Sequence, residues 1–339
     1  MTSAETILII GPAWVGDMVM AQSLFKLLRR KDPAAVIDVV GAPWSVPLVA
    51  RMPEVRRGIA LAAGHGDAAI GARWTLGREL RAEGYTRAIV LPRSFKSALV
   101  PRFARIPVRT GFRSEMRGLL LNDARTLDRA ALDQTVRRLL ALGLPAGAPI
   151  PEPPQPSLRI DPANRAALLE KFSLGRLPAV AMMPGVAYGP AKQWPIEYFG
   201  ELARTLAAAG DEVWVLGAAG ERGLGEQIRR IGGPEVHNLC GDTRLEDTVD
   251  LLSAVRAAVT NDSGLMHVAA AAGAHVVAIY GSSSPAFTPP LTDRKAIYYL
   301  GIECSPCFQR ECPLGHLRCL REIGSHSVAE TILGLQGKA

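Results

Sequence analysis

Residues 258–285 read AVTNDSGLMHVAAAAGAHVVAIYGSSSP and contain two strand–turn units in succession. Their hydrophobic pattern predicts the end of a strand (258–260), a polar turn (261–264), a small Ala-rich helix (265–272), a second buried strand (276–280) and a glycine-led turn (281–284). Strand, helix and strand in this order predict a parallel sheet, and both turns then lie at the edge where such sheets bind ligands.

The turn 261–264 also begins a helix, whose unpaired N–H groups and dipole favour a phosphate. The alternative is that Asp262 or Ser263 only caps that helix. The rest of the chain shows the same organisation, with further polar turns after its predicted strands.

Strands alternate with helices on both sides of the proline-rich stretch 144–156, which predicts doubly wound parallel sheets. The first half predicts strands at 6–10, 36–40, 88–91 and 109–111, with helices at 18–30 and ending at 78–83. The second half predicts strands at 180–183, 212–216 and 236–238, with helices at 196–209, 221–231, 246–256 and 327–335.

The stretch 144–156, LPAGAPIPEPPQP, has six prolines in thirteen residues and cannot form a helix or a central strand. We predict an N-terminal domain at 1–156, a C-terminal domain at 157–322 and a last helical segment at 323–339, with packing on the N-terminal domain as one option. Two doubly wound domains joined in this way are expected to face each other across a ligand-binding cleft.

The chain of 339 residues carries a net charge of +7, with a sequence pI of about 9.4, which indicates an anionic partner. Nucleic acid, a phospholipid surface and a phosphorylated sugar all qualify. Between residues 93 and 125 eight Lys and Arg stand against two acidic residues, interleaved with apolar side chains. This segment favours a membrane surface or an amphiphilic acidic substrate, and a solvated face is the alternative.

No apolar run reaches the roughly 20 residues of a membrane span. The N-terminal sequence MTSAETILIIGPAW lacks a basic n-region, so no signal peptide is predicted. We therefore expect a cytoplasmic protein.

The turn Gly11–Asp17 follows the first strand but lacks the GxGxxG dinucleotide fingerprint. Val39-Val40-Gly41 also lacks the acidic residue that an NAD-dependent oxidoreductase places at the end of its second strand. Asp17 stands at a helix entrance, where it serves as an N-cap or as a general base that takes a proton from an acceptor hydroxyl.

Lys192 is the single cation of the glycine-containing loop 183–195, where an ammonium can neutralise a diphosphate leaving group. Glu221 ends the turn 217–221 and either accepts hydrogen bonds from a ribose or caps a helix.

Four cysteines lie within sixteen residues, at Cys304, Cys307, Cys312 and Cys319, with His316 among them. Their spacing permits a structural zinc site, with free thiols or a redox-sensitive pair as the alternatives. Cys240 stands alone and is predicted to lie in the core.

Several stretches resemble the ADP-heptose:lipopolysaccharide heptosyltransferases, and among them the type II enzymes. The matching stretches follow one another in the family's order over almost the whole chain: 9–24 (IIGPAWVGDMVMAQSL), 189–195 (GPAKQWP), 261–270 (NDSGLMHVAA) and 284–290 (SPAFTPP).

The resemblance implies an α/β GT-B fold and metal-independent, inverting transfer of heptose from ADP-heptose to the first heptose of the Kdo–lipid A inner core. It also implies that the protein needs no cofactor, is a monomer and does not bind nucleic acid. The expected location is the inner face of the inner membrane. Carried over to this sequence, it implies that Asp17 and Lys192 are catalytic. The implied donor-binding residues are Gly185, Tyr188, Glu221, Thr243, Leu245, Asp262, Ser263, Gly264 and His267. Trp14, Arg93, Lys96 and Arg113 are expected to bind the acceptor.

One departure concerns Val186-Ala187-Tyr188, where related enzymes place hydroxyl residues near the phosphates. Ala187 cannot serve, so Tyr188 or backbone N–H groups are expected to. The alternatives are another GT-B transferase, such as heptosyltransferase I or a Kdo or GlcNAc transferase, a zinc-stapled nucleic-acid binder and a nicotinamide oxidoreductase.

Overall fold

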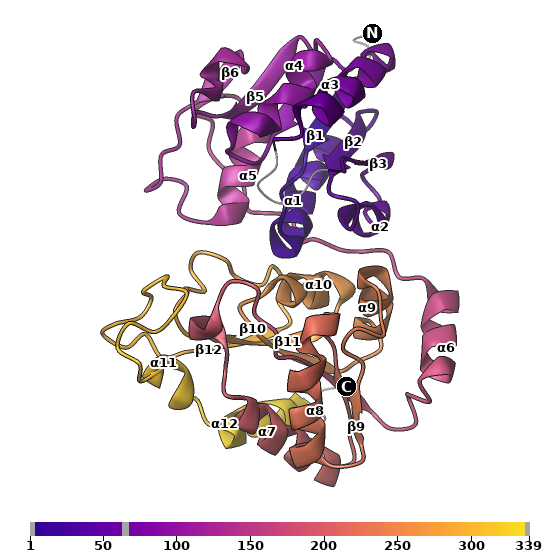
Figure 1. Cartoon of the computed structure of the whole chain (residues 1–339), viewed down its shortest axis with the longest axis vertical. Coiled ribbons are helices and arrows are strands. Elements are labelled where there is room, and N and C mark those ends of the chain that lie inside the picture. Colours follow the sequence, from indigo (N-terminus) through magenta and orange to yellow (C-terminus); the bar gives the residue numbers. More distant parts are fainter. Residues whose placement is uncertain (1–3, 63–67, 336–339) are drawn as a thin grey trace. The chain divides into compact units, whose positions relative to one another are not determined.

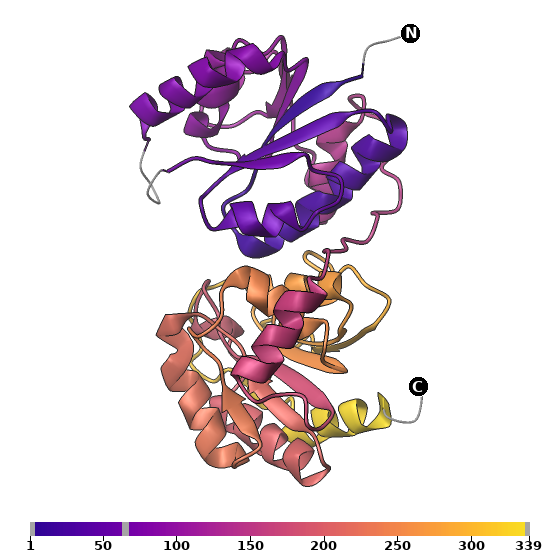
Figure 2. The ribbon, with the colours of Figure 1, turned by 90° about the vertical axis from the view of Figure 1, so that its right-hand side faces the viewer.

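The computed structural model describes residues 4–62 and 68–335, and the chain divides into two compact units, Met1–Pro156 and Ser157–Ala339. Residues 336–339 of the predicted last segment lie outside the described part. Each unit contains a six-stranded, fully parallel sheet with helices packed on it (Figure 1; Figure 2). The predicted pair of doubly wound α/β domains is confirmed.

The first unit alternates strands and helices as expected from its sequence. Its strands are β1 (Thr6–Ile10), β2 (Val36–Gly41), β3 (Arg57–Ala60), β4 (Arg87–Val90), β5 (Val108–Phe112) and β6 (Asp123–Arg125). Its helices are α1 (Val15–Lys31), α2 (Ser45–Ala50), α3 (Ile70–Glu79), η1 (Leu80–Glu83), η2 (Phe95–Ala98), α4 (Leu99–Phe103), η3 (Arg117–Leu119) and α5 (Thr135–Gly143).

The second unit repeats this organisation. Its strands are β7 (Ala179–Met183), β8 (Glu212–Val215), β9 (Val236–Asn238), β10 (Ala257–Asn261), β11 (His275–Tyr280) and β12 (Lys295–Tyr299). Its helices are α6 (Pro162–Lys171), η4 (Pro190–Lys192), α7 (Ile196–Ala208), η5 (Ala219–Glu221), α8 (Arg222–Gly232), α9 (Leu245–Leu252), α10 (Gly264–Ala272), α11 (Arg318–Arg321) and α12 (Ser325–Leu333).

Both sheets have the same strand order, although the two halves share no visible sequence repeat. The orders are β3-β2-β1-β4-β5-β6 and β9-β8-β7-β10-β11-β12. In each case the first and fourth strands of the unit are neighbours, and the chain runs outward from them in opposite directions. The loops after these two strands meet at the topological switch point, where open α/β sheets bind their ligands.

Helices cover both faces of each sheet. In the second unit α7 packs with α8 and α12, and α9 packs with α6 and α10 (Figure 1). Every residue of β7 and β10 is buried, as expected for central parallel strands that are enclosed on both faces.

Helix α12 has its buried residues Val328, Ala329 and Ile332 in the core of the second unit, beside α7. This last helix therefore belongs to the second unit. No helix in the described ranges 4–62 and 68–335 is long and apolar enough to cross a bilayer.

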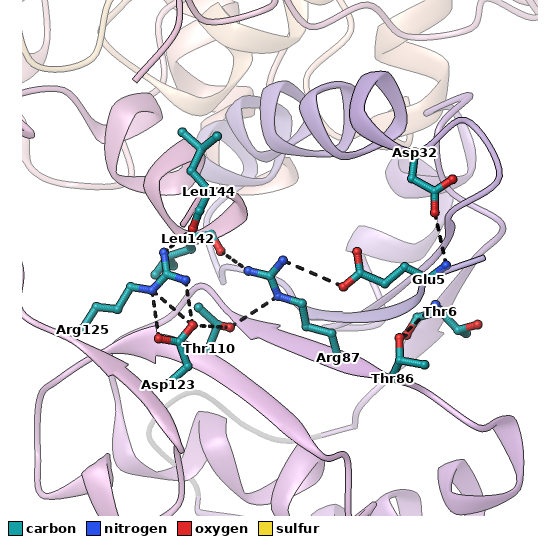
Figure 3. A network of polar contacts seen from close by, with 10 residues as sticks. All are labelled: Glu5, Thr6, Asp32, Thr86, Arg87, Thr110, Asp123, Arg125, Leu142 and Leu144. Atoms are coloured by element: carbon teal, nitrogen blue, oxygen red, sulfur yellow. Dashed lines mark hydrogen bonds and ion pairs between the residues drawn. The ribbon is translucent and has the colours of Figure 1, made fainter. Parts of the chain in front are cut away.

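A polar network closes the amino end of the first sheet (Figure 3). Arg87, at the start of β4, donates to the carbonyl oxygen of Leu142 (2.8 Å) and to Thr110 Oγ1 (3.4 Å). Arg125, at the end of β6, donates to the carbonyl oxygen of Leu144 (2.7 Å). These bonds join β4, β5 and β6 to the end of α5.

The proline-rich connection has neither helix nor strand over residues 148–161. On one side the Ser23 hydroxyl donates to the carbonyl oxygen of Pro154 (2.7 Å), and on the other the Leu158 N–H donates to that of Ala271 (2.9 Å). The connection is thus attached to α1 in the first unit and to the end of α10 in the second.

Candidate functional site

Lys192 and Asp262 meet at the switch point of the second sheet. Lys192 ends η4 after β7, and Asp262 follows β10, the strand that pairs with β7. Lys192 Nζ lies 2.5 Å from Asp262 Oδ2, and the two side chains are 18% and 7% exposed. The other carboxylate oxygen of Asp262 accepts a hydrogen bond from Thr288 Oγ1 at 3.3 Å.

The capping interpretation of Asp262 and Ser263 is wrong. The N-cap residue of α10 is Ser263, which makes no side-chain capping bond, and its hydroxyl lies 3.3 Å from Thr260 Oγ1. The Asp262 carboxylate is turned to Lys192 and Thr288 instead. The first turn of α10, which begins at Gly264, therefore receives no side-chain cap from its N-cap residue, as expected for an anion site at a helix start.

Asn261 fixes the Lys192 loop from the end of β10. Its side-chain amide donates to the carbonyl oxygen of Pro184 (2.8 Å) and accepts from the Trp194 N–H (2.9 Å). Trp194 is fully buried, and its indole N–H donates to the carbonyl oxygen of Ile323 (2.9 Å). Both ends of the loop that carries Lys192 are thus held by one buried side chain.

Tyr188 lies close to two cations. Lys192 Nζ is 5.1 Å and the Arg310 guanidinium carbon 5.7 Å from the centre of its ring. The tyrosine hydroxyl donates to the carbonyl oxygen of Phe308 (2.7 Å), so it is already engaged. The backbone N–H groups are therefore better candidates than the Tyr188 hydroxyl for the phosphate contact that Ala187 cannot make. Arg310 adds a cation that was not predicted from the sequence.

His267 is buried in α10, within electrostatic range of Asp262 and Lys192. Burial, and to a smaller extent Lys192, lower its pKa to about 4, although Asp262 acts in the opposite direction. His267 is therefore neutral at physiological pH, and it can offer or accept a hydrogen bond but adds no charge to the site.

Glu221 occupies a space that two glycines leave open. A Cβ atom on Gly185 would lie 1.8 Å from Glu221 Oε1, and one on Gly217 would lie 2.4 Å from Oε2. Glu221 Oε2 accepts a hydrogen bond from the Ala218 N–H at 2.7 Å. One carboxylate oxygen of Glu221 therefore makes the capping bond that the alternative interpretation expects. The carboxylate bridges the loops after β7 and β8, and a ribose contact remains a proposal.

The remaining predicted donor residues, Thr243 and Leu245, lie in the turn after β9. Thr243 Oγ1 is 3.4 Å from Thr248 Oγ1, and Leu245 is the first residue of α9. The Gly241 N–H donates to the carbonyl oxygen of Gly217 (2.9 Å), which joins this turn to the loop after β8. All nine predicted donor residues therefore follow the carboxyl ends of four adjacent strands.

In the first unit, the predicted residues follow β1, β4 and β5. Helix α1 begins at Val15 with Trp14 as its N-cap residue, so Asp17 is the third helical residue and not the N-cap. Asp17 is half-buried and Trp14 is exposed. Arg93 and Lys96 follow β4, the neighbour of β1, which places them with Asp17 at the switch point of this sheet.

Arg113 follows β5, one strand further from the switch point. Its side chain is exposed, and Nε donates to the carbonyl oxygen of Ala124 (3.1 Å). The predicted acceptor residues thus lie on one edge of the first sheet.

Several polar residues at these edges were not predicted as functional. Ser282 and Ser283, after β11, have buried hydroxyls with no hydrogen-bond partner within the described ranges. Thr288 belongs to the stretch 284–290, which resembles the family. That resemblance indicates that the stretch is functional but does not indicate which of its residues contacts the site. Asn261 likewise begins the family-like stretch 261–270, but its contacts with Pro184 and Trp194 depend on a segment far away in the sequence. Arg310 carries no local signal.

The four clustered cysteines are free thiols, and Cys319 is buried. Nowhere in residues 4–62 and 68–335 do three or more His, Cys, Asp or Glu side chains form a group that could hold a metal ion. Backbone N–H groups, that of Leu317 first, bind the Cys312 sulfur and lower its pKa. The structural zinc site and the redox-sensitive pair stay predictions, whereas Cys240 is a core residue as predicted.

Comparisons with known proteins agree with this arrangement. The family model described as glycosyltransferase family 9 (heptosyltransferase) matches residues 73–318. The chain is 46% identical over 305 residues to lipopolysaccharide heptosyltransferase 2 of Salmonella typhimurium, covering 87% of this chain and 88% of that protein. It is 44% identical over 308 residues to lipooligosaccharide heptosyltransferase 2 of Haemophilus influenzae, with the same coverage.

The structure of Escherichia coli ADP-heptose LPS heptosyltransferase II superimposes on this chain with a TM-score of 0.86 and 41% sequence identity. The superposition covers 98% of this chain and 100% of the other. The GT-B-type fold and the family inferred from the sequence are both confirmed. The match over 73–318 and the level of identity show that the chain belongs to glycosyltransferase family 9, the heptosyltransferase family.

Proposed function

We propose that the protein moves L-glycero-D-manno-heptose from ADP-heptose to the first heptose of the Kdo–lipid A inner core, with inversion at the anomeric carbon. The observation that carries this proposal is the Lys192–Asp262 pair at the switch point of the second sheet. The names of the relatives, heptosyltransferase 2 in Salmonella typhimurium and Haemophilus influenzae, support the choice of sugar and of acceptor.

The second unit offers the chemistry that an ADP-sugar requires. Lys192, Arg310 and the start of α10 supply positive charge for the diphosphate. Asp262 is held by Lys192 and Thr288, and its carboxylate is suited to accept hydrogen bonds from the heptose hydroxyls. Glu221, between the loops after β7 and β8, is assigned to the ribose.

The first unit supplies the base. Asp17 takes the proton of the acceptor hydroxyl. At the same time the oxygen of that hydroxyl attacks the anomeric carbon from the side opposite the diphosphate. The bond between that carbon and the phosphate oxygen breaks, and its electron pair leaves with ADP. Lys192 stabilises the charge that develops on the leaving group. The proposed transfer thus requires both Asp17 and the Lys192–Asp262 pair.

The acceptor is anionic and bound to a lipid, which fits the basic edge that carries Arg93, Lys96 and Arg113. We propose that the enzyme works as a monomer on the inner face of the inner membrane, without a cofactor and without nucleic acid. Sedimentation of the purified chain tests the oligomeric state independently of activity.

The test is an incubation of the purified protein with ADP-heptose and mono-heptosylated core. The proposal predicts one added heptose, release of ADP and an inverted linkage by NMR. Transfer only from a UDP-sugar, or only to an acceptor that lacks the first heptose, would contradict it and favour another GT-B transferase.

A further inference from the structure

Three large apolar side chains are exposed together on the first unit. The exposed fractions are 39% for Phe95, 80% for Met116 and 78% for Leu119. Met116 and Leu119 are three residues apart around η3, and the Leu119 N–H donates to the carbonyl oxygen of Met116 (3.3 Å). Met116 is the N-cap residue of η3 and Leu119 is its last residue, so one short turn presents both exposed side chains as one apolar projection.

The loop between β5 and β6, residues 113–122, holds this projection in an unfavourable backbone conformation. Glu115 (φ 44°) and Met116 (φ 57°) both lie in the left-handed region, which non-glycine residues rarely adopt. Met116 thus has a backbone conformation that non-glycine residues disfavour, and its apolar side chain is exposed to solvent instead of buried. Such a conformation persists only where the surroundings impose it.

The buried side chain of Arg117 holds the loop in that conformation through hydrogen bonds. Its side chain is fully buried, Nε donates to the carbonyl oxygen of Phe112 (2.7 Å), and Nη1 donates to Ser97 Oγ (3.1 Å) and to the carbonyl oxygen of Pro92. The β5–β6 loop is therefore anchored to the segment that follows β4.

Glu115 makes the second connection, because its Oε2 accepts the N–H of Phe95 at 2.7 Å. This bond joins the β5–β6 loop to the first residue of η2. Phe95, Met116 and Leu119 are thus parts of one fixed surface, which we call the Met116 patch.

Cations border the Met116 patch. Arg93 and Arg113 are exposed and Lys96 is half-buried, and these three residues stand next to or within two residues of Phe95 and Glu115 in the chain. Glu115 is the acidic residue of the β5–β6 loop, and it is bound to the Phe95 N–H. Apolar side chains surrounded by cations match an anionic bilayer surface, with phosphates above and acyl chains below.

We propose that the Met116 patch docks the first unit onto an anionic phospholipid surface. Met116, Leu119 and Phe95 enter the boundary between headgroups and acyl chains, while Arg93, Lys96 and Arg113 bind lipid phosphates. The inference extends the proposed function in that it assigns the surface by which the enzyme reaches a lipid-linked acceptor. A sugar chain is a poorer occupant, because Met and Leu side chains offer it no hydrogen bonds.

The test measures binding of the full-length protein to vesicles of phosphatidylcholine with or without phosphatidylglycerol, without donor or acceptor. The wild type should bind the phosphatidylglycerol vesicles, and salt should weaken that binding. The double variant Met116→Ser/Leu119→Ser should bind about tenfold or more weakly, because it loses two apolar groups. The control Leu177→Ser/Leu314→Ser removes two exposed leucines from the second unit and should bind like the wild type.

Thermal melting and ADP binding confirm that each variant is folded. Transfer to a water-soluble, deacylated acceptor should be unchanged in Met116→Ser/Leu119→Ser. The proposal is overturned if the wild type ignores the anionic vesicles, or if the double variant binds them like the wild type. It is also overturned if vesicle binding persists while the Michaelis constant for the deacylated acceptor rises, because the patch would then bind the glycan. Absence of heptose transfer would affect the proposed function alone.

Discussion

Lys192 Nζ and Asp262 Oδ2 lie 2.5 Å apart, although seventy residues separate them in the chain. The two residues follow β7 and β10. These parallel strands are neighbours because the chain first adds β8 and β9 on one side of β7 and then returns to add β10 on its other side. The proposed cation for the leaving group and the proposed carboxylate for the sugar hydroxyls are thus placed together by the strand order itself. This pre-organisation is what electrostatic catalysis requires.

Replacing Lys192 by alanine should weaken donor binding and slow turnover together. The substitution removes the ammonium that we assign to the leaving diphosphate, so kcat should fall roughly 10²–10³-fold. Steady-state kinetics with varied ADP-heptose measure both effects. Lys171→Ala, which removes a lysine from α6 in the same unit, is the matched control. Wild-type turnover in Lys192→Ala would refute the role assigned to this residue.

Thr288 is predicted to position Asp262. Thr288→Val removes the hydrogen bond to Asp262 Oδ1 at nearly constant volume, and a bond to a charged group lost in this way costs roughly 1.5–3 kcal/mol. We expect kcat/KM for ADP-heptose to fall about 10- to 100-fold. Thr288→Ser keeps the hydroxyl and should restore most of the activity. If valine and serine behave alike, the hydroxyl has no such role.

Gly185 is predicted to be required because Glu221 occupies the space of its missing side chain. A Cβ in Gly185→Ala would overlap Glu221 Oε1, so the carboxylate must move. The Michaelis constant for ADP-heptose should rise about tenfold or more, as in Glu221→Ala, through loss of a charge-assisted hydrogen bond. Gly220→Ala adds the same methyl group where no atom lies within 4 Å and should leave this constant unchanged.

The stability of the second unit should depend on pH through His267. Its folded-state pKa of about 4 lies below the usual value of 6.5, so below pH 6.5 the unfolded chain binds the proton and the folded chain does not. The free energy of unfolding should therefore fall by about 2 kcal/mol between pH 7 and pH 5 through this group alone.

Urea unfolding of the wild type and of His267→Gln at these two pH values isolates that contribution, because all other titrating groups are common to both proteins. The wild type should lose more stability than the variant as the pH falls. Parallel losses would show that His267 can take up a proton in the folded state.

The alternation of strands and helices could be predicted from apolar runs, but the edge strands β3, β6 and β12 could not. Strands β3 and β12 have mixed burial because each lies at the end of a sheet, so no continuous apolar run marks them. The predicted helix 246–256 ends at Leu252, because the next residues turn back into β10. Local patterns thus identify central elements better than edges and boundaries.

The placement of candidate residues at the carboxyl edge of the sheet was predictable where they sit in turns after strands, as for Lys192, Glu221 and Asp262. It was not predictable where a side chain acts on a distant segment. Asn261 reaches the Pro184 carbonyl, and the fully buried Arg117 stands in a basic run that suggests solvent exposure. Contacts of this kind depend on strand order, which no local pattern contains.

The most direct test of the central claim compares Asp17→Asn with the wild type in a single experiment on heptose transfer and ADP affinity. The amide preserves the size of the side chain but cannot accept the proton of the acceptor hydroxyl. We predict a rate of transfer reduced roughly 10²–10⁴-fold with ADP affinity unchanged. Transfer by Asp17→Asn at close to the wild-type rate would contradict the proposal that this carboxylate is the base.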